Sequence, residues 1–120
     1  MRSIVVVDDY QPFRVAVREM LERDGFRVIG DASDRQGAIE SVRKLRPDVV
    51  LLDVHLPGDD GFQICEQLQQ FVPTPAVILT SSHDVASFRR RLRTSRARGF
   101  IGKADLTTAG LIELLESGSS

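Results

Sequence analysis

Short apolar runs alternate five times with longer segments of helical periodicity along this chain. The runs have the length of β-strands and lie at residues 4–7, 27–30, 49–52, 76–80 and 99–102. Several are apolar throughout, as in Val49-Val50-Leu51-Leu52. Continuous apolar runs are typical of parallel strands that are buried on both faces, whereas a half-exposed strand alternates. The pattern therefore predicts an α/β domain with a parallel sheet.

The segments between the runs have the spacing of amphipathic helices. The first begins near Pro12, because proline is favoured at the first helical position, and it ends before Asp24-Gly25. The second ends at Arg46-Pro47. The positions that define the five helices are Phe13, Val17, Met20 and Leu21, then Ala38, Val42 and Leu45, then Phe62, Cys65 and Leu68 or Gln69, then Phe88 and Leu92, and finally Leu111, Leu114 and Leu115.

Five such units with right-handed crossovers predict a doubly wound, five-stranded parallel sheet with five helices. By analogy with other small domains we expect the strand order 2-1-3-4-5, in which the first and third strands are neighbours. Ligand sites in such sheets lie beyond the carboxyl ends of the strands, where the strand order reverses. We expect one domain over residues 1–116 and a polar tail over residues 117–120.

Composition narrows the functional classes. The chain has 120 residues, of which 42% are hydrophobic, and its formal net charge is −1. No apolar run approaches the roughly 18 residues that span a bilayer, and the N-terminus has no secretory signal. Cys65 is the single cysteine, which excludes an intramolecular disulfide and a four-cysteine zinc site. These features predict a cytoplasmic protein that does not contact membranes.

Carboxylates follow two strands that the expected order makes neighbours. Asp8 and Asp9 come directly after the first strand, and Asp53 comes directly after the third. Either group alone is most simply a helix cap or a strand end. Three carboxylates in one crevice repel one another unless a cation intervenes, and Mg²⁺ prefers hard oxygen ligands. The sequence therefore predicts a Mg²⁺ site, which Mn²⁺ would also fill.

Two further side chains at strand ends complete the set of polar groups. Lys103 follows the fifth strand, and Thr80 ends the fourth. Taken singly, an exposed lysine and a β-favouring threonine are the simpler interpretations. Beside three carboxylates and a cation, an ammonium group and a hydroxyl would serve as ligands for a phosphoryl group.

In these elements the chain resembles the response-regulator receiver domains of two-component (phosphorelay) signalling. Val7-Asp8-Asp9 resembles the acidic pair of the family, and residues 47–61 resemble its phosphoacceptor strand and the loop that follows. Leu79-Thr80-Ser81 and the segment 99–103 resemble its switch-hydroxyl and lysine segments. The resemblance covers nearly the whole chain and implies the flavodoxin-like fold of the family.

The resemblance implies that Asp53 accepts a phosphoryl group from a phosphohistidine on a sensor histidine kinase or a phosphotransfer protein. Asp8, Asp9, the Asp53 carboxylate and the backbone carbonyl of His55 would hold Mg²⁺. Lys103 and Thr80 would bind the phosphoryl group. Thr80 would turn toward it, and Phe100, at the aromatic switch position, would move inward.

Three features depart from the family pattern. Ala104 follows Lys103 where many receivers have proline, and a cis bond before a non-proline residue costs about 2.5 to 4 kcal/mol, so the loop conformation is left open. The fourth helix is followed by Ser95-Arg96-Ala97-Arg98 and lacks the usual glycine cap. His55 and Ser82 occupy variable positions beside the site.

Six arginines crowd into residues 89–98, where a solvated helix face is the simplest explanation. The resemblance implies that the face of the fourth helix, fifth strand and fifth helix responds to phosphorylation. Arg89 and Arg93 are therefore candidate contacts to a downstream protein or to a second copy of the chain. Nucleic acid fits less well because interleaved aromatic residues are absent. Val15, outside the apolar stripe of the first helix, is a candidate contact for the phosphodonor.

The sequence is thus interpreted as a stand-alone receiver, not an enzyme beyond its own phosphotransfer and autodephosphorylation, whose output comes from partner binding. One alternative is the receiver part of a longer DNA-binding response regulator, and another is a pseudo-receiver that works without phosphorylation. A phosphatase with an aspartyl nucleophile is disfavoured, because such enzymes need a second carboxylate two residues on, where this chain has His55.

Overall fold

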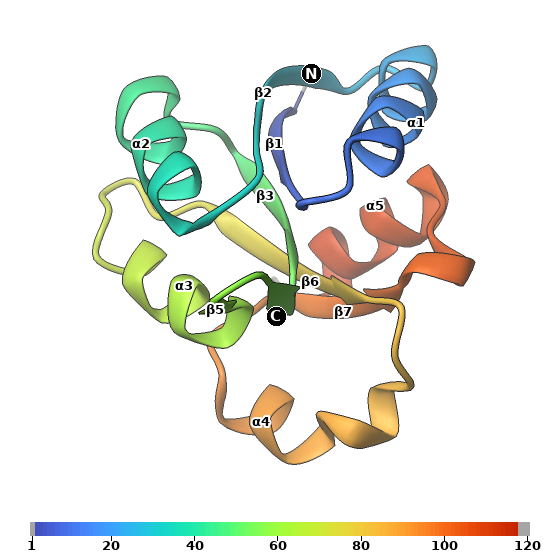
Figure 1. Ribbon diagram of the computed structural model, residues 1–120. Helices are drawn as coiled ribbons and strands as arrows, with labels where there is room; N and C mark the ends of the chain where they lie inside the picture. The colour runs from blue at the N-terminus through green and yellow to red at the C-terminus, as the bar shows by residue number, and fades with distance from the viewer. Residues whose placement is uncertain (1, 118–120) are drawn as a thin grey trace.

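A computed structural model describes residues 2–117 and shows a central parallel sheet with helices on both faces (Figure 1). Its strands are β1 (Ser3–Val7), β2 (Arg27–Ala32), β3 (Val49–Asp53), β6 (Ala76–Ser81) and β7 (Gly99–Gly102). They run in the order β2-β1-β3-β6-β7, which confirms the predicted order 2-1-3-4-5. Four of the five extend beyond the predicted runs, so that β3 ends in Asp53 itself.

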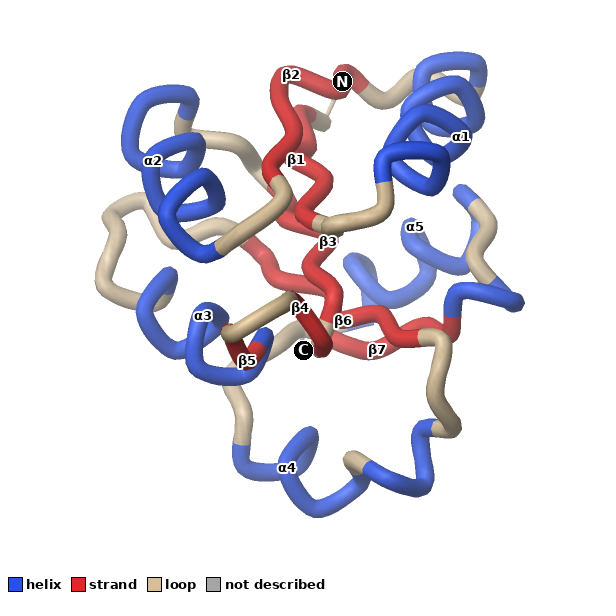
Figure 2. Tube along the Cα trace, viewed as in Figure 1, coloured by secondary structure: helices blue, strands red, loops and turns tan. Residues whose placement is uncertain are grey.

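The helices are α1 (Gln11–Arg23), α2 (Arg35–Leu45), α3 (Gly61–Leu68), α4 (Arg89–Thr94) and α5 (Thr108–Ser117). Two short 3₁₀ helices precede α4 and follow β7, namely η1 (Val85–Ser87) and η2 (Lys103–Asp105). Figure 2 shows α1 and α5 on one face of the sheet and α2 and α3 on the other, with α4 beyond β6 and β7. A small antiparallel pair, β4 (His55–Leu56) and β5 (Asp59–Asp60), was not anticipated from the sequence.

The core consists of two apolar layers that share the sheet. Val5 and Val7 pack into the layer beneath α2 and α3, while Ile4 and Val6 pack into the layer beneath α1 and α5. Strand β3 divides in the same way, and none of its residues is more than 5% exposed. Burial on both faces explains why these strands are apolar at successive positions.

The fourth helix is shorter than its neighbours, with six residues and no buried side chain of its own. Phe88, which the apolar pattern placed on this helix, is its N-cap residue and is buried. Ser95 serves at the other end in place of the missing glycine. Its hydroxyl donates to the carbonyl of Leu92 at 2.8 Å and accepts from the N–H of Ala97 at 3.3 Å, which satisfies groups that the helix end leaves free.

Ser117, the first residue of the predicted polar tail 117–120, is the last residue of α5. Residues 118–120 lie outside the described part of the chain. Among the described residues, no helix is long and apolar enough to cross a membrane.

Candidate functional site

Three carboxylates meet beyond the carboxyl ends of β1 and β3. The two strands pair in parallel, with Val7 opposite Leu52, so the residues that follow them lie at the same edge of the sheet. Oxygens of Asp8, Asp9 and Asp53 lie within 4.8 Å of one another. Asp8 is completely buried and Asp53 is 5% exposed, whereas Asp9 faces solvent. This is the arrangement that the sequence predicted for these residues.

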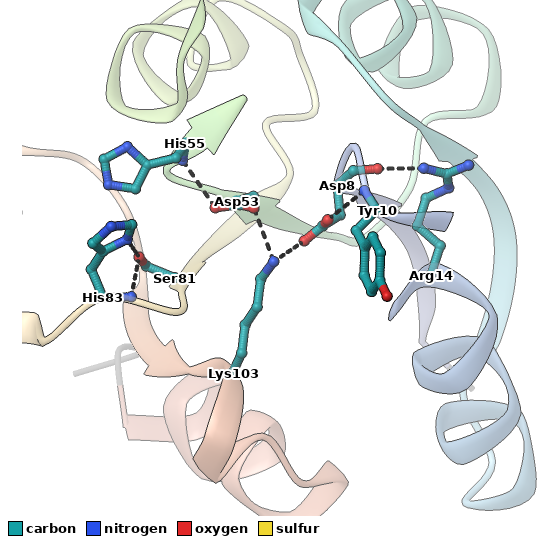
Figure 3. A network of polar contacts seen from close by, with 8 residues as sticks. All are labelled: Asp8, Tyr10, Arg14, Asp53, His55, Ser81, His83 and Lys103. Carbon is teal, nitrogen blue, oxygen red and sulfur yellow. Dashed lines mark hydrogen bonds and ion pairs between the residues drawn. The ribbon is translucent and has the colours of Figure 1, made fainter. Parts of the chain in front are cut away.

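Lys103 joins the two buried carboxylates (Figure 3). Its Nζ lies 2.6 Å from Asp8 Oδ2 and 3.0 Å from Asp53 Oδ2. Burial by itself lowers the pKa of Lys103, but the two carboxylates outweigh it and raise that pKa above its usual value. Burial raises the pKa of Asp53, because the backbone N–H of His55 and the ammonium of Lys103 only partly offset the loss of hydration.

The second oxygen of each buried carboxylate is held by the backbone. The N–H of Tyr10 donates to Asp8 Oδ1 at 2.9 Å, and the N–H of His55 donates to Asp53 Oδ1 at 2.9 Å. Arg14 steadies the same turn, since its Nη1 donates to the carbonyl of Asp8 at 2.5 Å. The carboxylates are therefore oriented before any ligand arrives.

Thr80 carries a buried hydroxyl beside the phosphoacceptor candidate. It lies opposite Asp53 in the pairing of β3 with β6 and is 0% exposed. Within residues 2–117, its Oγ1 has no hydrogen-bond partner. A buried polar group without a partner costs about 1 to 3 kcal/mol. An oxygen of a ligand bound beside Asp53 would accept a hydrogen bond from the Thr80 hydroxyl and remove this cost.

The donor set fits a magnesium ion. All three side chains offer carboxylate oxygens, which Mg²⁺ prefers, and the exposed Asp9 leaves room for the waters that this ion retains. Together with Lys103, the three carboxylates leave two negative charges uncompensated, which a divalent cation would neutralise. The family resemblance implies that the carbonyl of His55 would be a backbone ligand, and the N–H of the same residue contacts Asp53.

A cleft of about 440 Å³ lies beside the site, lined by residues 81–85 and 100–105. Phe100 lines it, is half-buried, and packs against Phe88 with ring centroids 6.0 Å apart. His83 also lines the cleft, and its ring is tilted by 59° against that of His55, with the ring centroids 4.5 Å apart. Sequence analysis did not single out His83, because a loop residue three positions beyond Thr80 has no periodic signal.

The lysine loop has a definite conformation in this chain. Lys103 begins η2, and the N–H of Leu106 donates to its carbonyl at 3.4 Å. The Lys103–Ala104 peptide bond is trans. The geometry around Nζ is therefore reached without a cis bond before Ala104.

The candidate contact residues are exposed on two helices. Val15 is 48% exposed on α1, as expected for a residue off the apolar stripe. Arg89 and Arg93 are exposed on α4. Their neighbour Arg91 forms an ion pair with Asp60 and lies over the ring of Phe62, with its guanidinium carbon 4.3 Å from the ring centroid.

Comparisons with known proteins agree with this geometry. The family model for the response regulator receiver domain matches residues 4–115. Response regulator GacA of Pseudomonas viridiflava is 32% identical over 118 residues, which are 98% of this chain and 53% of that protein. Protein-glutamate methylesterase/protein-glutamine glutaminase 3 of Hahella chejuensis is 35% identical over 83 residues, which are 69% of this chain and 24% of that protein.

Among solved structures, the signal receiver domain of the response regulator NarL from Mycobacterium tuberculosis superposes with a TM-score of 0.83 and 32% identity. The match covers 99% of this chain and 97% of that one. The chain spans about half the length of several curated relatives that it matches, GacA among them, and a smaller share of others.

Proposed function

The chain belongs to the response-regulator receiver family of two-component signalling, and from that membership we propose that Asp53 is its phosphoacceptor. The observation that carries the proposal is the position of Lys103 between Asp8 and Asp53, with Thr80 beside them. This arrangement supplies a nucleophile, an ammonium group and a free hydroxyl around one point, which is the requirement for binding a phosphoryl group.

In the proposed reaction, an Asp53 carboxylate oxygen attacks the phosphorus of a phosphohistidine on a histidine kinase or phosphotransfer protein. The new oxygen–phosphorus bond forms as the phosphorus–nitrogen bond breaks, and its electron pair returns to the imidazole. Asp8, Asp9, Asp53 and the carbonyl of His55 would hold Mg²⁺, which neutralises the charge that gathers on the phosphoryl oxygens. Catalysis then rests on positioning and charge rather than on a separate acid or base.

After transfer, Lys103 would pair with a phosphoryl oxygen and the hydroxyl of Thr80 would donate to another. Thr80 is fully buried and unpaired among the described residues, so the phosphoryl oxygen gives it the partner that it lacks here. We propose that Phe100, half-buried at the edge of the neighbouring cleft, moves inward as Thr80 turns. Phenylalanine has no hydroxyl, so only packing would report this change.

The output is proposed to be altered binding of a downstream protein or of a second copy through α4, β7 and α5, where Arg89 and Arg93 are exposed. We propose a cytoplasmic setting and no enzymatic activity beyond phosphotransfer and autodephosphorylation on Asp53. A second candidate is favoured by one observation, which is that the chain spans about half the length of relatives named as transcriptional regulators. In that case, the receiver would control an attached DNA-binding domain.

The decisive experiment is intact-mass analysis after incubation with Mg²⁺ and acetyl phosphate. The unmodified protein should gain one phosphoryl group. Asp53→Asn, and the unmodified protein without Mg²⁺, should gain none. If the mass does not change and a beryllofluoride titration leaves the spectra unaltered, the phosphoacceptor proposal is wrong and the pseudo-receiver alternative replaces it.

A further inference from the structure

Lys103 has a third contact that lies outside the set of carboxylates. Its Nζ sits over the ring of Phe13, 4.5 Å from the ring centroid. Phe13 belongs to the first turn of α1 and is half-buried against the apolar layer beneath α1 and α5. An ammonium group over an aromatic face is attracted by the ring, and the attraction grows as water is excluded. The Lys103 side chain is only 20% exposed, so the contact is largely shielded from solvent.

The other two contacts of Lys103 are the ones that a metal ion would disturb. Its Nζ is held by Oδ2 of Asp8 and by Oδ2 of Asp53, and both carboxylates belong to the cluster that fits Mg²⁺. A divalent cation bound there would compete for these oxygens and would repel the ammonium group at short range. The ring of Phe13 carries no charge and coordinates no metal, so this contact would persist.

We propose that Phe13 is a positioning residue, whose ring keeps the Lys103 ammonium group facing Asp53 when Mg²⁺ occupies the carboxylates. This inference rests on the proposed function, because its purpose is to keep Lys103 ready for an incoming phosphoryl oxygen. Without the ring, the long lysine side chain would turn toward the exposed side of the site, and the rotamer entropy that it regains would oppose its return.

The simpler explanation is that Phe13 only fills the core, since it lies on the apolar stripe of α1 with Val17 and Leu21. A core role requires volume and hydrophobicity, which leucine also supplies at modest cost. A positioning role requires the aromatic face. Phe13→Leu and Phe13→Tyr therefore separate the two explanations, because both keep an apolar body at residue 13 and only the second keeps the ring.

The experiment measures two affinities by NMR titration, first of Mg²⁺ alone and then of beryllofluoride at saturating Mg²⁺. For Phe13→Leu we expect beryllofluoride to bind about 5-fold more weakly, corresponding to a cation–π contact of about 1 kcal/mol. The Mg²⁺ affinity should stay within about twofold or increase, because a mobile ammonium group repels the cation less. Phe13→Tyr should match the unmodified protein in both titrations.

A loss of both affinities in Phe13→Leu would indicate a structural role and overturn the proposal. Unchanged beryllofluoride binding in this variant would overturn it as well.

A second measurement tests the contact between Phe13 and Lys103 directly and does not depend on phosphoryl chemistry. The ring current of Phe13 should shift the ε-methylene protons of Lys103 upfield, both without metal and at saturating Mg²⁺, and Phe13→Leu should remove this shift. If the shift disappears when Mg²⁺ binds to the unmodified protein, the proposal is wrong. Should beryllofluoride bind to no variant, the proposed function fails, while the shift still tests Phe13.

Discussion

Helices α1 and α4 both flank the carboxyl edge of the sheet, but they are anchored very differently. α1 has 13 residues, a proline in its first turn, and two buried side chains, Val17 and Leu21. α4 has six residues and no buried side chain, and neither helix has a side-chain cap at its N-terminus. The side chains that α1 sends to the site, Phe13 and Arg14, hold Lys103 and the Asp8 turn. The side of the site next to α1 is therefore held more firmly than the side next to α4.

The start of α4 opposes helix formation. Arg89 and Arg90 open the helix, where the positive end of the helix dipole disfavours cations by about 0.3 to 1 kcal/mol each. Arg91 and Arg93 lie in its last turn, where cations are favoured. A helix of this length is not stable in isolation, so it depends on contacts with the rest of the molecule. Those contacts are the neighbouring Phe88, the partly buried Leu92 and the ion pair of Arg91 with Asp60. We expect α4 to open locally at a lower free energy than α1.

The largest expected difference is in the free energy of unfolding when a leucine that holds each helix to the core is truncated. Leu21→Ala removes a 0% exposed side chain of α1 and should lower the free energy of unfolding by about 2 to 5 kcal/mol. Leu92→Ala removes a partly buried side chain of α4 and should cost less than half as much. Urea unfolding followed by circular dichroism measures both. Equal losses would mean that α4 is anchored as firmly as α1, and the contrast would fail.

A smaller effect is expected where the loop after Asp53 approaches α3. A Cβ on Gly61 would lie 2.7 Å from Val54 Cα, so Gly61→Ala forces the backbone apart next to Asp53. Overpacking of this kind costs about 1 to 3 kcal/mol. We expect this loss in urea unfolding, together with weaker beryllofluoride binding.

Gly58→Ala is the matched control for this substitution. Gly58 has a φ of +72° and nothing within 4 Å of an added Cβ, so alanine there strains the turn without displacing Asp53. It should lower stability by about 1 kcal/mol and leave beryllofluoride affinity unchanged. If both glycine variants weaken binding equally, the close approach at Gly61 has no specific role in placing Asp53.

Replacing Arg91 tests the weaker attachment of α4 to the rest of the molecule. Arg91→Gln removes both the ion pair with Asp60 and the contact with the Phe62 ring, which together are worth roughly 1 kcal/mol at a half-exposed position. Amide hydrogen exchange in α4 should become about 5-fold faster, while exchange in α1 stays unchanged. Arg93→Gln is the matched control, since Arg93 is exposed on the same helix. Equal acceleration by the two variants would show that charge alone, and not the contact of Arg91, sets the stability of α4.

The elements on the more firmly held side of the site were also easier to predict from the sequence. Strands β1 and β3 were found because burial on both faces makes them apolar throughout, and Asp8 and Asp53 followed because parallel strands end at one edge. The β4–β5 pair was missed because two-residue strands have no measurable period. Phe13 was assigned only to the core, because helical spacing gives the side of the helix but not its rotation relative to the Lys103 loop. That contact depends on tertiary packing between segments some 90 residues apart in the sequence.

The smallest expected effect is a pH dependence of stability that comes from the buried carboxylate of Asp53. Burial raises the pKa of Asp53 in the folded protein, so between the ordinary aspartate pKa of about 3.9 and that raised pKa the native state binds more protons than the unfolded chain. Stability without Mg²⁺ should therefore fall as the pH rises through this window. Asp53→Asn has no such proton and keeps the Lys103–Asp8 ion pair, so its stability relative to the unmodified protein should increase over the same window and then level off. Thermal unfolding at a series of pH values measures this difference, and a constant difference would contradict it. At neutral pH, saturating Mg²⁺ should make the unmodified protein more stable than Asp53→Asn. The ion binds the ionised carboxylate of the folded protein, and the asparagine variant offers one negative charge fewer.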